Sequence, residues 1–146
     1  LRRQLTSSLA AMKTTARVLL IVLLLVSTSA SAQVRTATIF LVPWDVETRA
    51  PLSESTVRKI ATIRTEILDK YYAQALLEWL TSESFIKPPN VNLPFNFRLV
   101  IDFTHEDGSI ESYYANWQEL LEVKSGKVRK IDGEFRSRFS SLIFYP

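Results

Sequence analysis

The side chains best suited to chemistry gather around the only histidine of the chain. His105 lies in the segment DFTHED, residues 102–107, so three carboxylates flank its imidazole. An imidazole oriented by a carboxylate can act as a general base, and imidazole and carboxylate groups together can bind a metal ion. However, a turn predicted at Asp107 and Gly108 puts His105 at a hairpin tip, and the spacing matches no common metal-ligand motif. We therefore expect a solvated turn residue and no metal site.

Other catalytic signatures are missing from the sequence. The chain has no cysteine, which excludes thiol catalysis, cysteine-ligated zinc and iron–sulfur clusters, and its three glycines exclude a P-loop or a dinucleotide fingerprint. No serine lies in a G-x-S-x-G pattern. A carboxylate pair for hydrolysis stays open, because such pairs meet only in the fold. We expect no cofactor, and we keep a carboxylate-dependent hydrolytic enzyme, with His105 as a helper, as an alternative.

Alternating apolar and polar residues over 97–104 (FRLVIDFT) predict a strand, and Asp107 with Gly108 predicts a two-residue hairpin turn after it. This turn pairs Asp102 with Tyr113. One face of the predicted hairpin then carries the apolar side chains of Phe97, Leu99, Ile101 and Phe103. The four residues placed on the opposite face are Arg98, Asp102, Tyr113 and Trp117. Two aromatic residues and two charges resemble the composition of interface hot spots, so this face is a candidate binding surface. An ordinary half-solvated sheet face gives the same alternation.

A second hairpin, predicted around Ser125 and Gly126, carries a cluster of cations. Its members are Lys124, Lys127, Arg129 and Lys130. Such a cluster can contact anionic lipid headgroups, phosphates or an acidic protein. It can equally be a charged sheet edge, on which lysines prevent aggregation between sheets.

The remaining elements follow from caps and periodicity. Residues 36–44 read as a first strand, and Ser53 caps a helix over 54–60. The stretch 57–80 is either one long helix or a strand over 61–67 followed by a helix over 70–82. The β-branched segment TIRTEI and a possible cap at Asp69 favour the second interpretation. Asp132 caps a last helix. The sequence thus predicts a single α+β domain, with a largely antiparallel sheet of about five strands and two or three helices packed on one face.

The segment MKTTARVLLIVLLLVSTSASAQ, residues 12–33, has the pattern of a secretory signal peptide. Two cations, Lys13 and Arg17, precede nine apolar residues, and an A-x-A triplet ends at Ala32. We expect a signal peptide over 12–32, cleavage after Ala32, and a mature domain over 33–146. A bilayer span needs about 20 apolar residues, so an uncleaved anchor is the less favoured alternative. Residues 1–11 precede the only methionine and are expected to be upstream translation or a gene-model artefact.

The basic character of the whole chain resides in this leader. The four cations before Gln33, out of eighteen in the chain, leave fourteen basic side chains against fifteen acidic ones in residues 33–146. A near-neutral domain gives no electrostatic indication of nucleic-acid binding. The sequence therefore favours a small periplasmic or secreted bacterial domain that acts as a non-catalytic binding module, with an envelope or extracellular protein as partner and no membrane span after cleavage. The envelope hydrolase and an inner-membrane-anchored structural protein remain as alternatives.

Overall fold

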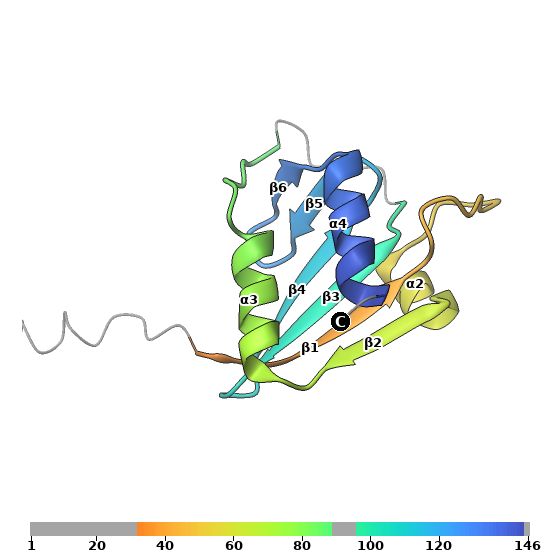
Figure 1. Cartoon of the computed structure of the whole chain (residues 1–146). Coiled ribbons are helices and arrows are strands. Elements are labelled where there is room, and N and C mark those ends of the chain that lie inside the picture. Colours follow the sequence, from red (N-terminus) through yellow and green to blue (C-terminus); the bar gives the residue numbers. More distant parts are fainter. Residues whose placement is uncertain (1–31, 89–95, 145–146) are drawn as a thin grey trace, which may run out of the picture. The chain divides into compact units, whose positions relative to one another are not determined.

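A computed structural model describes residues 32–88 and 96–144 of the chain. These residues form a single α+β domain with an open, six-stranded antiparallel sheet in the order β2-β1-β3-β4-β5-β6 (Figure 1). The strands are β1 (Val34–Leu41), β2 (Ile63–Ile67), β3 (Leu99–His105), β4 (Ile110–Ala115), β5 (Glu119–Glu122) and β6 (Lys127–Lys130). The helices are α2 (Glu54–Ile60), α3 (Lys70–Leu80) and α4 (Gly133–Phe144). None of these helices has the length and apolar character needed to cross a membrane.

The helices cover both faces of the sheet, whereas the sequence analysis expected one. Helices α3 and α4 pack on one face, where Leu76 and Phe139 join the core residues of β1, β3 and β4 (Figure 1). Helix α2 packs on the other face through Val57, which contacts a smaller cluster that includes Phe40 and Val100. The cause is visible in the sequence, because β1 and β3 contain unbroken apolar runs that place apolar side chains on both faces.

Helix starts agree with the predicted caps. The Ser53 side chain accepts a hydrogen bond from the Thr56 amide, and the Asp69 carboxylate accepts from the amides of Tyr71 and Tyr72. Asp132 accepts from the Phe135 amide at 2.8 Å. The division of residues 57–80 into a strand and a helix is therefore confirmed, with α2 in front of them.

The register of the β3–β4 hairpin differs by one residue from the prediction. Three residues, 106–108, form the loop, with Gly108 at φ +81° and its amide bonded to the His105 carbonyl. The extra residue pairs Asp102 with Ser112 in place of Tyr113. Because side chains alternate between faces, this shift turns Tyr113 to the α3–α4 face. The two-residue turn was wrong because a DG pair also suits a three-residue loop with a left-handed glycine.

Regular strand structure also begins later than expected, at Leu99. Phe97 consequently packs in the α2-side cluster and not with Leu99, Ile101 and Phe103. The second hairpin forms where it was predicted, with Glu122 paired to Lys127 and Gly126 at φ +66°.

Candidate functional site

The four residues of the predicted aromatic and charged face do not share one surface. Tyr113 is 1% exposed and lies in the core on the α3–α4 side, whereas Asp102 belongs to the α2 side. Trp117 lies beyond the end of β4, where its ring contacts Trp44 at 6.0 Å. Arg98 is 4% exposed, and one of its nitrogens donates to Thr48 at 3.4 Å. The predicted face is therefore absent as a continuous surface, because it depended on the two-residue turn.

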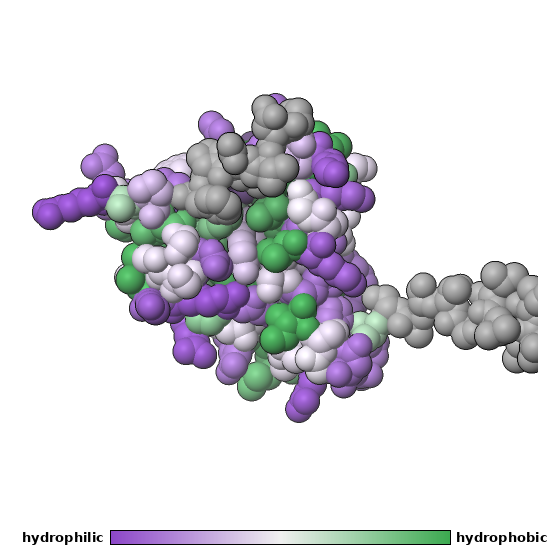
Figure 2. All heavy atoms as spheres, turned by 180° about the vertical axis from the view of Figure 1, so that it is seen from behind, coloured by the Kyte–Doolittle hydropathy of each residue, from purple (hydrophilic) through white to green (hydrophobic). Residues whose placement is uncertain are grey.

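Asp102 is fully engaged within the fold. Its carboxylate accepts two hydrogen bonds from the Arg58 guanidinium and one from the Ser112 hydroxyl. The hydrogen bond to Asp102 raises the pKa of Arg58 above its ordinary value. This ion pair ties α2 to the sheet, so Asp102 has a structural role here. Figure 2 shows this side of the domain, with apolar residues in separate small areas among hydrophilic ones. The visible side thus lacks the broad apolar patch that marks many interfaces.

The cations of the second hairpin fall into two environments. Lys124, Lys127 and Lys130 are exposed, as expected for a charged edge. Arg129 is only 5% exposed and points to the α3–α4 side, opposite Leu120 of β5. Charged side chains are seldom fully buried in a protein interior unless they are paired with an opposite charge.

Aromatic rings hold the Arg129 guanidinium in place. Its central carbon lies 5.1 Å from the ring centroid of Phe135 in α4 and 6.0 Å from that of Phe85. Phe135 in turn stacks on Trp79 of α3, with centroids 5.0 Å apart and an angle of 7° between the planes. Phe85 is positioned by the next residue, Ile86, whose backbone pairs with that of Val128 in β6. These contacts place the buried cation beside two aromatic rings, and cation–π attraction is stronger at such desolvated positions than at exposed ones.

The guanidinium is only partly paired. Arg129 Nη1 makes an ion pair with Glu83 at 2.9 Å, and Arg129 Nε is buried with no hydrogen-bond partner in the part of the chain that the structure describes. The Glu83 side chain is 69% exposed, so the partner of this buried cation is itself in water. A buried donor without a partner costs about 1–3 kcal/mol, which favours any anionic group that could complete the pairing.

A cavity of about 400 Å³ adjoins Arg129 between β6, the end of α3 and the first turns of α4. We call it the Arg129 pocket. The lining residues that matter for its chemistry are Trp79, Glu83, Arg129, Lys130, Phe135 and Arg138. Figure 1 shows the end of α3 and the start of α4 on the β5–β6 side of the sheet, where this pocket lies.

The pocket lining carries three cations, Arg129, Lys130 and Arg138, and three carboxylates, Glu83, Asp132 and Glu134, so its formal charge is zero. Glu134 and Arg138 pair with each other at 2.6 Å, and the Asp132 carboxylate caps α4. Lys130 has no ion pair within the described part of the chain, and Arg129 has one that is largely exposed to water. Because Arg129 is buried beside aromatic rings and its carboxylate partner lies largely in water, the pocket suits a ligand with an anionic group beside an apolar or aromatic one.

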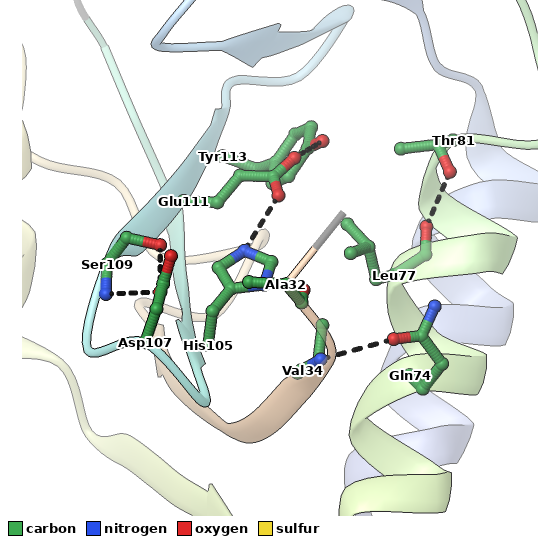
Figure 3. Close-up of polar contacts among 10 residues, drawn as sticks. All are labelled: Ala32, Val34, Gln74, Leu77, Thr81, His105, Asp107, Ser109, Glu111 and Tyr113. Carbon is green, nitrogen blue, oxygen red and sulfur yellow. Dashed lines mark hydrogen bonds and ion pairs between the residues drawn. The ribbon is translucent and has the colours of Figure 1, made fainter. Parts of the chain in front are cut away.

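A second polar cluster lies around His105, at the end of β3 (Figure 3). His105 is 7% exposed, which corrects the expected solvated turn residue: it is the last residue of β3, and alternation puts its ring on the same face as Phe103. Its Nε2 lies 3.0 Å from Glu111 Oε2, and its Nδ1 lies 2.6 Å from the Ala32 carbonyl oxygen. The Tyr113 hydroxyl donates to the other oxygen of Glu111. Burial, and next the hydrogen bond to Glu111, raise the pKa of Tyr113 well above its ordinary value.

This cluster resembles part of a catalytic triad in composition only. In the described chain both ring nitrogens of His105 face acceptors, the Glu111 carboxylate and the Ala32 carbonyl, and neither is directed at a nucleophile; cleavage after Ala32 would leave the Glu111 contact alone. Within residues 32–88 and 96–144, no three histidine, aspartate or glutamate side chains are grouped to hold a metal ion. The arrangement serves to join β4 to the start of β1 and the end of β3.

Sequence reasoning found two residues of the Arg129 pocket, Arg129 and Lys130, but missed its other members. Trp79 and Phe135 have the helical spacing of ordinary core residues, and this spacing gave no other signal. Glu83 lies in a short connector after α3, where nothing in the sequence marks it as the partner of a strand residue 46 positions later. Only the fold brings these residues together.

Comparison with known proteins finds no counterpart: no family model matches the chain, and neither a curated protein nor a solved structure is significantly similar to it.

Proposed function

We propose that residues 33–146 form an exported, non-catalytic binding domain that holds an anionic group of its ligand in the Arg129 pocket. The observation that carries the proposal is the Arg129 guanidinium, which is buried beside two aromatic rings and whose only ion-pair partner among the described residues is an exposed carboxylate. Export is inferred from the signal-peptide pattern of residues 12–32.

Arg129 is already desolvated and oriented in the folded domain before a ligand binds. Because folding has already removed Arg129 from water and fixed its orientation, the Arg129 side chain would lose little further entropy or solvation when a ligand binds. Arginine also offers a planar fork of donors that matches planar or tetrahedral anions. Buried arginine and tryptophan residues are among those that contribute most to binding at interfaces.

The pocket's composition indicates the kind of partner. Trp79 and Phe135 supply aromatic surface beside the buried Arg129, whose only ion-pair partner among the described residues is the exposed Glu83. We therefore propose a protein partner outside the cytoplasm that inserts one anionic group and an adjacent apolar group. The catalytic alternative has less support, because the only histidine is 7% exposed and its Nε2 is bonded to Glu111 within the domain.

The test uses the three tryptophans as reporters. Trp79 lines the pocket, whereas Trp44 and Trp117 contact each other elsewhere. In a ¹⁵N-labelled domain, titration with sodium benzoate or phenyl phosphate should shift the Trp79 indole signal saturably and leave the other two indole signals in place. Benzamide, which has the same ring without the charge, should have little effect. If neither anion moves the Trp79 signal, or if benzamide moves it equally, the proposed function is wrong.

A further inference from the structure

Glu83 differs from the other carboxylates that line the Arg129 pocket. Asp132 is committed to capping α4 and Glu134 to the ion pair with Arg138, so each belongs to its own helix. Glu83 lies in the connector between α3 and the short bridge at Ile86, and its recorded partner is Arg129. Among the described residues, it is therefore the one pocket carboxylate whose only polar contact is with the buried cation.

We propose that Glu83 occupies the position of the ligand's anionic group, which is a carboxylate, and competes with it for Arg129. This inference rests on the proposed function and names the ligand class of the same site. Glu83 shows which kind of group can pair with the cation, because one of its carboxylate oxygens lies 2.9 Å from Arg129 Nη1. A ligand carboxylate would replace one such oxygen with another and keep the buried charge paired throughout.

Exchange at this position is easy for physical reasons. The Glu83 side chain is 69% exposed, so little solvation has to be restored when it leaves Arg129. Ion pairs with a largely exposed member contribute little to stability. Glu83 is also tethered to the connector and contacts one nitrogen of the guanidinium, whereas a free carboxylate can align with two donors of the fork.

Substitution of Glu83 should therefore strengthen binding. We expect Glu83→Gln to lower the dissociation constant for sodium benzoate, measured from the Trp79 indole signal, by about two- to fivefold, the range that corresponds to loss of an exposed competing ion pair. Glu83→Asp, which keeps the charge but shortens the side chain by one methylene, should shift the constant in the same direction.

Glu134→Gln is the matched control, because it removes one negative charge from the same pocket without touching Arg129. If Glu83→Gln leaves the constant unchanged or raises it, or if Glu134→Gln lowers it equally, Glu83 is not a stand-in for the ligand. Binding of phenyl phosphate without binding of benzoate would overturn the carboxylate assignment but leave the proposed function intact. Failure of both anions to bind the wild-type domain and Glu83→Gln would overturn both proposals.

Discussion

At the scale of single residues, burial separates side chains that look equivalent in the sequence. Lys127 and Arg129 are two positions apart on the same strand, but one is exposed and the other is 5% exposed beside aromatic rings. The alternation of a strand predicts that they share a face, and it does not predict that α4 covers only one of them. Cation type was the available clue, since arginine stacks on aromatic rings and tolerates burial better than lysine.

His105 and Tyr113 illustrate the same limit. Their neighbour Glu111 was assigned no role in the sequence analysis, although its carboxylate bonds to both of them. The three residues meet because the hairpin register puts them on one face, so a one-residue error in the turn was enough to hide the cluster.

Tyr113 gives a prediction for alkaline stability. Burial and Glu111 raise its pKa in the folded state above the unfolded value of about 10, so its contribution to stability is complete below about pH 10. Above that pH the unfolded chain loses the proton first, and the contribution decreases. Between pH 9 and 11, the unfolding free energy of the wild type should therefore fall more steeply with pH than that of Tyr113→Phe, by up to about 1.4 kcal/mol per pH unit.

Urea unfolding at a series of pH values measures this difference. Tyr71→Phe is the control, because Tyr71 is 73% exposed in the folded domain and its removal should leave the wild-type slope unchanged. Equal slopes for the wild type and Tyr113→Phe would show that Tyr113 ionises as readily in the folded domain as in the unfolded chain.

At the scale of elements, the sequence predicted the features that depend on neighbouring residues alone. Ser53, Asp69 and Asp132 are helix caps both in the sequence analysis and in the structure, because a cap depends on its own side chain and the next three amides. β-branched residues identified β2 correctly. The loop length of the β3–β4 hairpin was not predictable in this way, since the DG pair fits both two- and three-residue turns.

The β3–β4 loop also gives a test of its geometry. Gly108 has φ +81°, a left-handed conformation that costs other L-residues about 1–2 kcal/mol. Gly108→Ala should destabilise the domain by about that amount in urea or thermal unfolding, although a Cβ there meets no atom within 4 Å. Gly133→Ala should be neutral or stabilising, because Gly133 lies in the first turn of α4 and its Cβ would meet only a side-chain atom at 3.7 Å. A Gly108→Ala variant as stable as the wild type would argue against the three-residue loop.

At the scale of the whole molecule, the apolar runs in the strands indicated that both faces of the sheet are covered, and the sequence analysis did not use this indication. The runs in β1 and β3 require cover on both faces, and the helix assigned to residues 54–60 was available to supply it. Which face each helix takes depends on contacts between distant segments. The same is true of the Arg129 pocket, whose members come from α3, the following connector, β6 and α4.

Processing of the N-terminal segment is a prediction about the whole chain. In a bacterial host that exports the protein, intact mass and N-terminal peptide mass spectrometry should find a chain that begins at Gln33, because residues 12–32 carry the charged, apolar and small-residue regions of a signal peptide. An intact mass that still includes Met12, found in the membrane fraction, would instead support the uncleaved anchor.

The central claim is that Arg129 holds the anionic group of a ligand, and the most direct measurement is a benzoate titration of Arg129→Met followed at the Trp79 indole signal. The matched control is Arg138→Met, which removes an exposed cation from the same pocket. We predict that Arg129→Met weakens benzoate binding by about tenfold or more, the loss expected for a charge-assisted hydrogen bond, and that Arg138→Met changes it much less. Trp44 and Trp117 signals at their wild-type positions would show that the fold is kept. Equal affinity in the wild type and Arg129→Met would contradict the claim.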